Sequence, residues 1–181
     1  MRMKTRTTAA TAVIAALICM ICIVGCGSGH KGEDGPDPVP APTPSASTRF
    51  DFQTTTIDGQ RVGFADYSDA NVILVNLWEP WCGPCVGEMP DLERLYEAHK
   101  DQGFLIIGAY STVQQKDDAL AIMAQCGTTY PVIVVTSDFD AYQTGYVPTS
   151  FLVDGDGNVL SEPIVGSHSY KEWESIIEPY L

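Results

Sequence analysis

Two cysteines, Cys82 and Cys85, are separated by two residues, a spacing that supports reversible disulfide chemistry. The apolar run at 72–75 predicts a buried strand just before them, and the residues from Pro84 onward have a helical pattern. We therefore expect Cys82 at the N-terminus of a helix, where free backbone N–H groups and the helix dipole favour a thiolate over a thiol. Because the thiolate attacks disulfides, the pair is a candidate site for thiol–disulfide exchange.

The two cysteines are expected to have different roles. Cys82 should be partly exposed and act as the attacking thiolate, whereas Cys85, one turn inside the helix, should be more buried and resolve the mixed disulfide. Gly83 and Pro84 shape the turn between them, and proline suits the first helical turn because its missing N–H needs no partner there. A zinc site is disfavoured, because neither paired histidines nor a second such cysteine pair accompanies them in the part of the chain expected to fold.

The other four cysteines divide into three groups. Cys19 and Cys22 lie in an apolar stretch that follows three basic residues, and residues 1–25 are typical of an export signal that is removed. The residues Ile-Val-Gly-Cys that end at Cys26 resemble the lipobox of bacterial lipoproteins, which implies that Cys26 is lipidated and becomes the N-terminus. A signal anchor, or a cleaved secretory signal in which Cys26 has no role, is the alternative. Cys126 is expected to be a small buried thiol.

Composition divides the rest of the chain into a tether and a domain. Residues 26–48 hold few apolar residues and carry proline at alternate positions from Pro36 to Pro44, so we expect an extended tether without a core. Residues 49–181 have the size of one domain. The net charge of −13 disfavours binding to nucleic acid or directly to anionic lipid head groups. Attachment to the membrane would then depend on the acyl chains of the lipid.

Apolar patterning in residues 49–181 predicts an α/β fold. We expect an N-terminal β-hairpin that turns at Asp58-Gly59, and a second hairpin that joins 151–153 to 159–164. Between them we expect strands at 71–77, 104–109 and 130–135 and helices at 84–100 and 117–125. A last helix should begin at Ser169, where Glu172 completes a capping box. Pro90 should kink the first helix, and Gly103 should end it. The acidic turn at 154–158 lacks the spacing of an EF-hand and is interpreted as a hairpin turn rather than a calcium loop. This order of elements predicts a mixed central sheet with helices on both faces.

The segment at 72–90, with its WCGPC motif and the following Pro90, resembles the active-site strand and helix of the thioredoxin superfamily. The N-terminal hairpin, the leader, Asn76 and Glu88 resemble the membrane-anchored TlpA/ResA-like branch. The resemblance covers nearly all of residues 49–181. It implies a thioredoxin-like fold with an added N-terminal hairpin and a thiol–disulfide oxidoreductase that needs no bound cofactor or metal.

Two further features of the resemblance concern substrate binding. Val147-Pro148 resembles the family's cis-proline loop, which packs beside the cysteine pair and leaves backbone groups free to bind a substrate peptide. An ordinary trans turn proline is the alternative. Of Trp78 and Trp81, one should pack in the core, and Trp81 should line the surface where a partner docks, together with Gly83 and Pro84.

The proton chemistry depends on three other residues. Asn76 stands where classical thioredoxins place a buried Asp that helps to move a proton from the second cysteine. An amide cannot titrate, so this role must pass to water or to another acid, with Glu79 and Glu88 as candidates. Glu88 resembles a glutamate that is common in the branch. For Glu79, a solvated surface position and a functional position both remain open, and a carboxylate near Cys82 would disfavour its thiolate.

These observations indicate an exported, lipid-anchored oxidoreductase on the extracytoplasmic face of a bacterial membrane. The Gly-Pro between the cysteines matches reducing thioredoxins, and the branch often reduces extracytoplasmic proteins, including apocytochrome c. The favoured interpretation is therefore a reductase of such proteins that receives electrons from a membrane-embedded thiol relay. An oxidase or isomerase is the alternative within the enzymes. A non-catalytic peptide-binding module is the alternative from another class, against which Cys82, Cys85 and Pro148 argue.

Overall fold

The computed structural model describes residues 49–181, so the proposed signal at 1–25, Cys26 and the proposed tether up to residue 48 lie outside the described residues. The elements follow the order β1 (Gln53–Thr55), β2 (Arg61–Gly63), β3 (Val72–Leu77), α1 (Gly83–His99), β4 (Phe104–Tyr110), α2 (Lys116–Cys126), β5 (Val132–Val134), β6 (Thr149–Asp154), β7 (Ile164–Val165) and α3 (Tyr170–Ile177). Short 3-10 helices lie between them, of which η1 (Phe64–Tyr67) and η4 (Ser137–Tyr142) cover the sheet. None of the helices within residues 49–181 has the length and apolar character that crossing a bilayer requires.

The main sheet is mixed, as predicted, with the strand order β5-β4-β3-β6-β7. Strand β3 lies at its centre, parallel to β4 and antiparallel to β6. Every residue of β3 is buried, which explains why its sequence is apolar at nearly every position instead of alternating. Strands β1 and β2 form a separate antiparallel pair, so the predicted N-terminal hairpin is confirmed.

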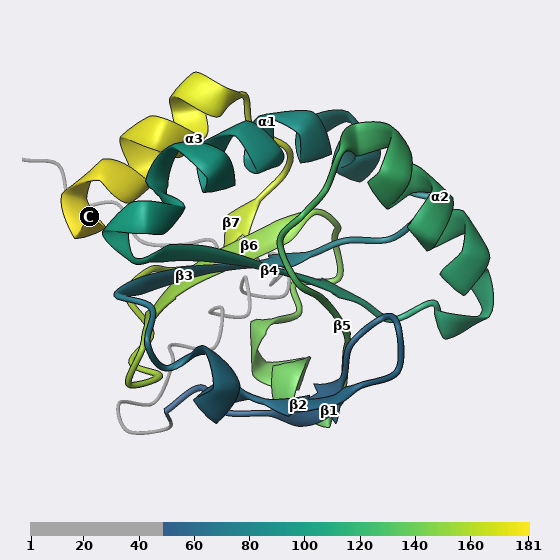
Figure 1. Ribbon diagram of the computed structural model, residues 1–181, viewed down its shortest axis with the longest axis horizontal. Helices are drawn as coiled ribbons and strands as arrows, with labels where there is room; N and C mark the ends of the chain where they lie inside the picture. Colours follow the sequence, from purple (N-terminus) through teal and green to yellow (C-terminus); the bar gives the residue numbers. More distant parts are fainter. Residues whose placement is uncertain (1–48) are drawn as a thin grey trace, which may run out of the picture. The chain divides into compact units, whose positions relative to one another are not determined.

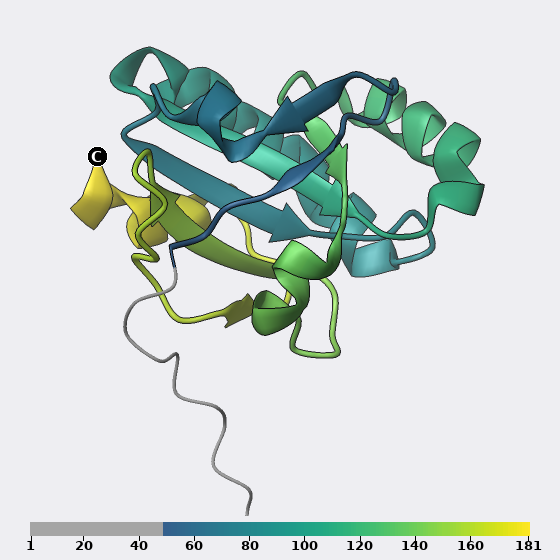
Figure 2. The ribbon, with the colours of Figure 1, turned by 90° about the horizontal axis from the view of Figure 1, so that it is seen from below.

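Helical segments flank the sheet on both faces, but the two faces differ in kind. The three α-helices lie together on one face, whereas the β1-β2 hairpin, η1 and η4 lie on the other (Figures 1 and 2). Alternate residues of β3 explain this division. Val72 and Leu74 belong to the apolar cluster that includes Met89 of α1, and Ile73 belongs to a second cluster that includes Phe50.

Helix α1 runs from Gly83 to His99 and contains Pro90, so this proline does not interrupt the helix, and the kink expected there stays a prediction. The Pro90 side chain is exposed and has no N–H to donate to the carbonyl of Val86, four residues earlier. The Cys126 sulfur at the end of α2 lies 3.9 Å from that carbonyl oxygen. Gly103, with a φ of 84°, ends the turn after α1 as expected.

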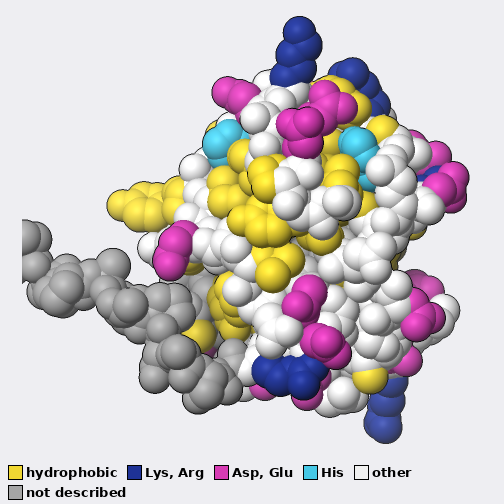
Figure 3. All heavy atoms as spheres, turned by 90° about the vertical axis from the view of Figure 1, so that its left-hand side faces the viewer, with side chains coloured by type: hydrophobic (Ala, Val, Ile, Leu, Met, Phe, Trp, Pro, Cys, Tyr) yellow, Lys and Arg dark blue, Asp and Glu magenta, His cyan; other side chains and the backbone are white. Residues whose placement is uncertain are grey.

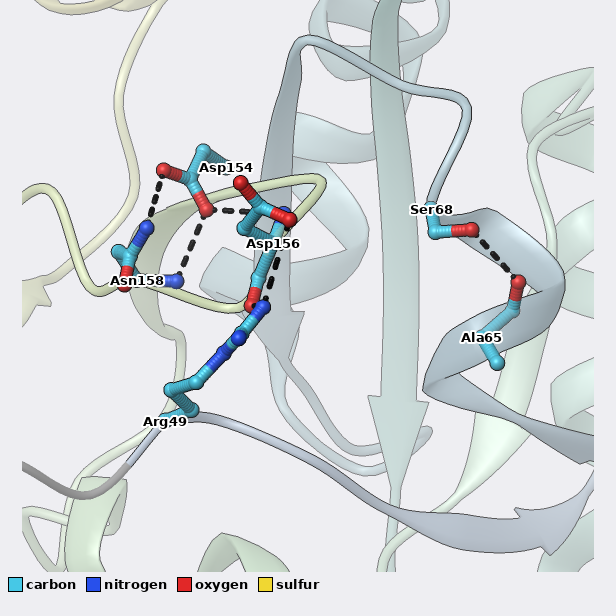
Figure 4. A network of polar contacts seen from close by, with 6 residues as sticks. All are labelled: Arg49, Ala65, Ser68, Asp154, Asp156 and Asn158. Carbon is cyan, nitrogen blue, oxygen red and sulfur yellow. Dashed lines mark hydrogen bonds and ion pairs between the residues drawn. The ribbon is translucent and has the colours of Figure 1, made fainter.

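The turn at 154–158 is held by its own side chains (Figure 4). The Asp154 carboxylate accepts hydrogen bonds from the backbone N–H groups of Asp156 and Asn158 and from the Asn158 amide. Arg49 donates to the carbonyl and the carboxylate of Asp156, and the Phe50 N–H donates to the Gly157 carbonyl at 2.8 Å. The structure therefore agrees with a hairpin turn, and this turn anchors the first described residues of the domain.

The surface on the side of the C-terminus has hydrophobic side chains at its centre (Figure 3). Acidic and basic side chains are spread around these hydrophobic groups rather than gathered by sign. Residues 49–181 carry 20 of the 23 acidic and 6 of the 10 basic residues of the chain. The acidic side chains seen on this face therefore do not form one cluster there.

Candidate active site

Cys82 and Cys85 form a disulfide at the N-terminus of α1. Cys82 is the N-cap residue of the helix, and its sulfur accepts a hydrogen bond from the Cys85 N–H at 3.2 Å. The predicted position of the pair, between the end of β3 and the start of a helix, is confirmed. A thiolate on Cys82 would receive the same backbone N–H and the positive end of the helix dipole.

Both sulfur-bearing residues are covered. Cys82 is 5% exposed and Cys85 is 1% exposed, so the expectation that Cys82 is partly exposed is wrong for this disulfide form, although the predicted order holds. The Val147 carbonyl oxygen lies 3.5 Å from the Cys82 sulfur and helps to cover it. The residues next to the pair in the chain, Trp81, Gly83 and Pro84, are exposed.

The loop before β6 lies against the disulfide. The Val147-Pro148 peptide bond is cis, which confirms the prediction, and Pro148 is buried. Its carbonyl accepts a hydrogen bond from the Gly166 N–H at 2.9 Å, which ties the loop to the residues after β7. This contact places the Val147 carbonyl beside Cys82.

Glu88 is buried one helical turn after Cys85 and is 3% exposed. Its Oε1 accepts a hydrogen bond from the Asn76 amide at 3.0 Å, and Oε2 accepts from the His168 N–H at 3.0 Å and from the Trp173 Nε1 at 3.3 Å. The Asn76 amide nitrogen also lies 3.0 Å from the Ser150 hydroxyl oxygen. The two sequence candidates Asn76 and Glu88 are thus in direct contact.

Burial raises the pKa of Glu88 to about 7, against the opposing effect of its three hydrogen-bond donors. This carboxyl group therefore changes its protonation near neutral pH. It lines a hollow of about 290 Å³ together with Pro84, Asp91 and His168, among others. The Glu88 carboxyl group thus lies on the same helix as Cys85, three residues later, and lines this hollow.

Glu79 is also buried, at 6% exposure, so the solvated surface position considered for it is wrong. Its Oε1 accepts hydrogen bonds from the N–H and the hydroxyl of Ser111, and its Oε2 accepts from the Thr112 N–H at 3.1 Å. Glu79 thereby joins the segment before Cys82 to the loop after β4.

Trp78 and Trp81 differ in burial as predicted: Trp78 is 1% exposed and Trp81 is 63% exposed. The Trp81 indole N–H donates to the Thr112 hydroxyl at 3.4 Å. Trp81, Glu79, Tyr146 and Val147 line a cavity of about 450 Å³ beside the disulfide. An exposed aromatic surface therefore lies next to Cys82.

Several site residues were not identified from the sequence: Ser111, Thr112, Ser150, His168 and Trp173. Ser150 could have been proposed from the sequence, because it lies two residues after Pro148. In the structure it pairs with Asn76 across β3 and β6. Cys126 is free and only half-buried, so the expectation of a buried thiol is not met, although burial still raises its pKa. Within residues 49–181, no three His, Cys, Asp or Glu side chains gather as potential metal ligands.

Comparison with known proteins gives consistent relatives. The AhpC/TSA family model matches residues 47–161. The thiol-disulfide oxidoreductase ResA of Geobacillus kaustophilus is 34% identical over 134 residues, which cover 73% of this chain and 75% of the relative. ResA of Bacillus subtilis is 30% identical over 132 residues, which cover 72% of this chain and 70% of the relative. A crystal structure of a thioredoxin-family thiol:disulfide interchange protein from Chlorobium tepidum is similar with a TM-score of 0.64 and 27% identity, covering 75% of this chain and 99% of that chain.

Proposed function

This chain belongs to the AhpC/TSA family and is a thiol–disulfide oxidoreductase with a thioredoxin-like fold, and we propose that it reduces disulfides in extracytoplasmic proteins. The observation that carries the proposal is the Cys82–Cys85 pair at the N-terminus of α1, beside the cis-proline loop and a carboxyl group that titrates near neutral pH. Apocytochrome c is a candidate client.

The reaction transfers two electrons from the enzyme dithiol to a client disulfide. The Cys82 thiolate attacks one client sulfur, the client disulfide breaks, and the other client sulfur leaves as a thiolate that takes up a proton. The Cys85 thiolate then attacks the Cys82 sulfur, which breaks the mixed disulfide and releases the second client thiol. The Cys82–Cys85 disulfide remains and must be reduced again.

Glu88 is the residue to which we assign the proton transfer. Asn76 lacks a titratable group, but its amide donates to Glu88 and helps to position the carboxyl group. With a pKa of about 7, Glu88 can accept the Cys85 proton and return it at physiological pH. The three donors to Glu79 and its distance along the chain from Cys85 favour a different role for that residue.

A client chain is expected to bind over the exposed residues around the pair. The Trp81 side chain is 63% exposed. Gly83 and Pro84 are exposed too, and their side chains are too small to block access to the start of the helix. Pro148 has no N–H, and the Val147 carbonyl oxygen, 3.5 Å from the Cys82 sulfur, can accept a hydrogen bond from the backbone N–H of a client. These residues are the substrate-positioning residues of the proposal.

The residues before the domain support an extracytoplasmic location. An export signal at 1–25 and lipidation at Cys26 would hold the enzyme on the extracytoplasmic face of the cell membrane. A membrane-embedded dithiol relay would supply the two electrons for each turnover. The enzyme needs no bound cofactor, since the cysteine pair carries the electrons. A Cys26→Ser variant that still incorporates a labelled fatty acid would refute the anchor.

The reduction potential of the Cys82–Cys85 couple tests the direction of the reaction. The measurement equilibrates the full chain with glutathione or dithiothreitol buffers and follows tryptophan fluorescence. A potential near about −270 mV, as in thioredoxin, supports the reductase, whereas one near about −120 mV is that of an oxidant and overturns it. Insulin reduction at the expense of dithiothreitol tests activity itself, and absence of turnover by a folded protein would contradict both directions.

A further inference from the structure

Glu79 is a buried acid without a basic partner. Its side chain lines the cavity beside the disulfide, and the residue is only 6% exposed. Among residues 49–181, no Lys, Arg or His forms an ion pair with it. Burying a charge is unfavourable unless it is paired or hydrogen-bonded, and the three donors to Glu79, from Ser111 and Thr112, are all neutral groups.

The carboxylate retains capacity for another donor. Its Oε1 accepts two hydrogen bonds from Ser111, but its Oε2 accepts a single one, from the Thr112 N–H. An ionised carboxylate offers about four acceptor sites, so Oε2 can accept a further bond from a group that enters the cavity. A cationic donor would form the stronger, charge-assisted hydrogen bond there.

The cavity has aromatic walls. Trp81 is 63% exposed and Tyr146 is 73% exposed, and both line it. Exposed aromatic rings attract ammonium and guanidinium groups through their negative faces, and arginine also stacks on them. With a volume of about 450 Å³, the cavity is large enough for one long side chain.

The cavity adjoins the reacting sulfur. Trp81 is the residue directly before Cys82, and Val147, another lining residue, places its carbonyl oxygen 3.5 Å from the Cys82 sulfur. A polypeptide whose cysteine reaches Cys82 therefore has neighbouring side chains within reach of the cavity. The acidic domain, with 20 acidic and 6 basic residues, also attracts basic polypeptides.

We propose that this cavity binds the Arg or Lys side chain of a client polypeptide next to the client's disulfide-bonded cysteine. Glu79 supplies the opposite charge, and Trp81 and Tyr146 supply the aromatic walls. The proposal rests on the proposed function, because it defines which disulfides the Cys82–Cys85 pair reduces best. A role of Glu79 limited to bracing the 111–112 loop predicts only the weak preference that the overall charge of the domain gives.

The test compares two peptides that differ in one charge. Each peptide has an intrachain disulfide, with arginine beside one cysteine in the first and the neutral isostere citrulline in the second. The reduced full chain in detergent is mixed with an excess of each peptide, and tryptophan fluorescence gives the second-order rate constant for its oxidation. We expect the arginine peptide to react about tenfold faster, a ratio that corresponds to a single favourable ionic contact.

Three variants separate the cavity from the general charge of the domain. Glu79→Gln should reduce the arginine-to-citrulline ratio to about 2, because only the overall field remains. Glu162→Gln removes the same charge from an exposed position and should retain the wild-type ratio. Tyr146→Leu, at an exposed position where folding is not at risk, should reduce the ratio severalfold through loss of the aromatic wall.

The outcomes are distinguishable. A ratio near 1 in the wild-type protein, or equal losses in Glu79→Gln and Glu162→Gln, would overturn the proposal but leave the enzyme's function intact. Failure of the wild-type protein to react with either peptide would instead contradict the proposed function. Should Glu79→Gln not fold, as judged by circular dichroism, an unchanged ratio in Tyr146→Leu overturns the cavity proposal alone.

Discussion

The buried Glu88 carboxyl predicts how stability depends on pH. Burial raises its pKa from 4.5 to about 7, so the folded protein keeps a proton that the unfolded chain releases between these two values. Stability therefore falls as the pH rises through this range, and the loss is complete above the folded pKa. Each pKa unit corresponds to about 1.36 kcal/mol, so the wild-type protein should lose about 3 kcal/mol between about pH 4 and about pH 8 through this group.

Glu88→Gln removes the titration while keeping the shape of the side chain. Asn76 can rotate its amide so that its oxygen accepts from the new Gln nitrogen, whereas the His168 and Trp173 donors keep an oxygen to bind. The difference in unfolding free energy between Glu88→Gln and wild type should therefore rise in favour of the variant by about 3 kcal/mol over the same pH range.

Urea unfolding of the disulfide form measures this difference, because the two active-site cysteines then do not titrate. The variant, the wild type and the exposed control Glu162→Gln are each unfolded at about pH 4, 6 and 8. Curves for Glu88→Gln and wild type that stay parallel across this range, within about 0.5 kcal/mol, would show that Glu88 does not titrate near neutrality and would refute the reasoning.

Three other predictions concern the cysteines and one turn. Cys85→Ser should accumulate a mixed disulfide between Cys82 and a client peptide, which mass spectrometry detects, whereas Cys82→Ser should form none. A mixed disulfide on Cys85 in the Cys82→Ser variant would reverse the assigned roles. In the reduced protein at about pH 7, iodoacetamide should label Cys82 at least about tenfold faster than Cys126, whose pKa is raised by burial, and equal rates would contradict the helix effect. Gly157→Ala would place a Cβ 2.5 Å from a backbone oxygen, at a residue with a φ of 84°, and should destabilise the fold by about 2 kcal/mol or more. Gly127→Ala is the control: this residue has a φ of 71° but open space around it, and the substitution should cost about 1 kcal/mol. Equal losses of stability on urea unfolding would show that the steric contact does not matter.

Local signals were sufficient for most of the elements. The continuous apolar run of β3 and the Ser169–Glu172 capping box each depend on neighbouring residues, and both are present as predicted. The cis bond at Pro148 was predicted from a family resemblance rather than from local physics. Whether a proline ends a helix depends on the packing of the flanking turns, and in α1 the neighbouring Met89 and Leu92 are buried in the core, which nothing at Pro90 itself indicates.

Long-range contacts explain what the sequence did not reveal. Nothing next to Glu79 in the chain shows that a loop 32 residues later will bury it and donate to it. The coverage of Cys82 likewise depends on Val147, 65 residues away. The three α-helices cover one face of the sheet, and the other face packs against residues of the hairpin and of η4. This arrangement depends on contacts between segments far apart in the sequence.

The anchoring of Phe50 to the turn at 154–158 has a geometric consequence for how the enzyme meets its clients. Val72 pairs with Asp154 at one end of the central strands, and Leu77, just before the active-site segment, pairs with Thr149 at the other. The five steps of extended chain from Val72 to Leu77 separate these two ends by about 17 Å. The first described residues, Arg49 and Phe50, are thus fastened at the end of the central strands opposite to the reactive sulfur, so a client that docks over Cys82 does not meet them.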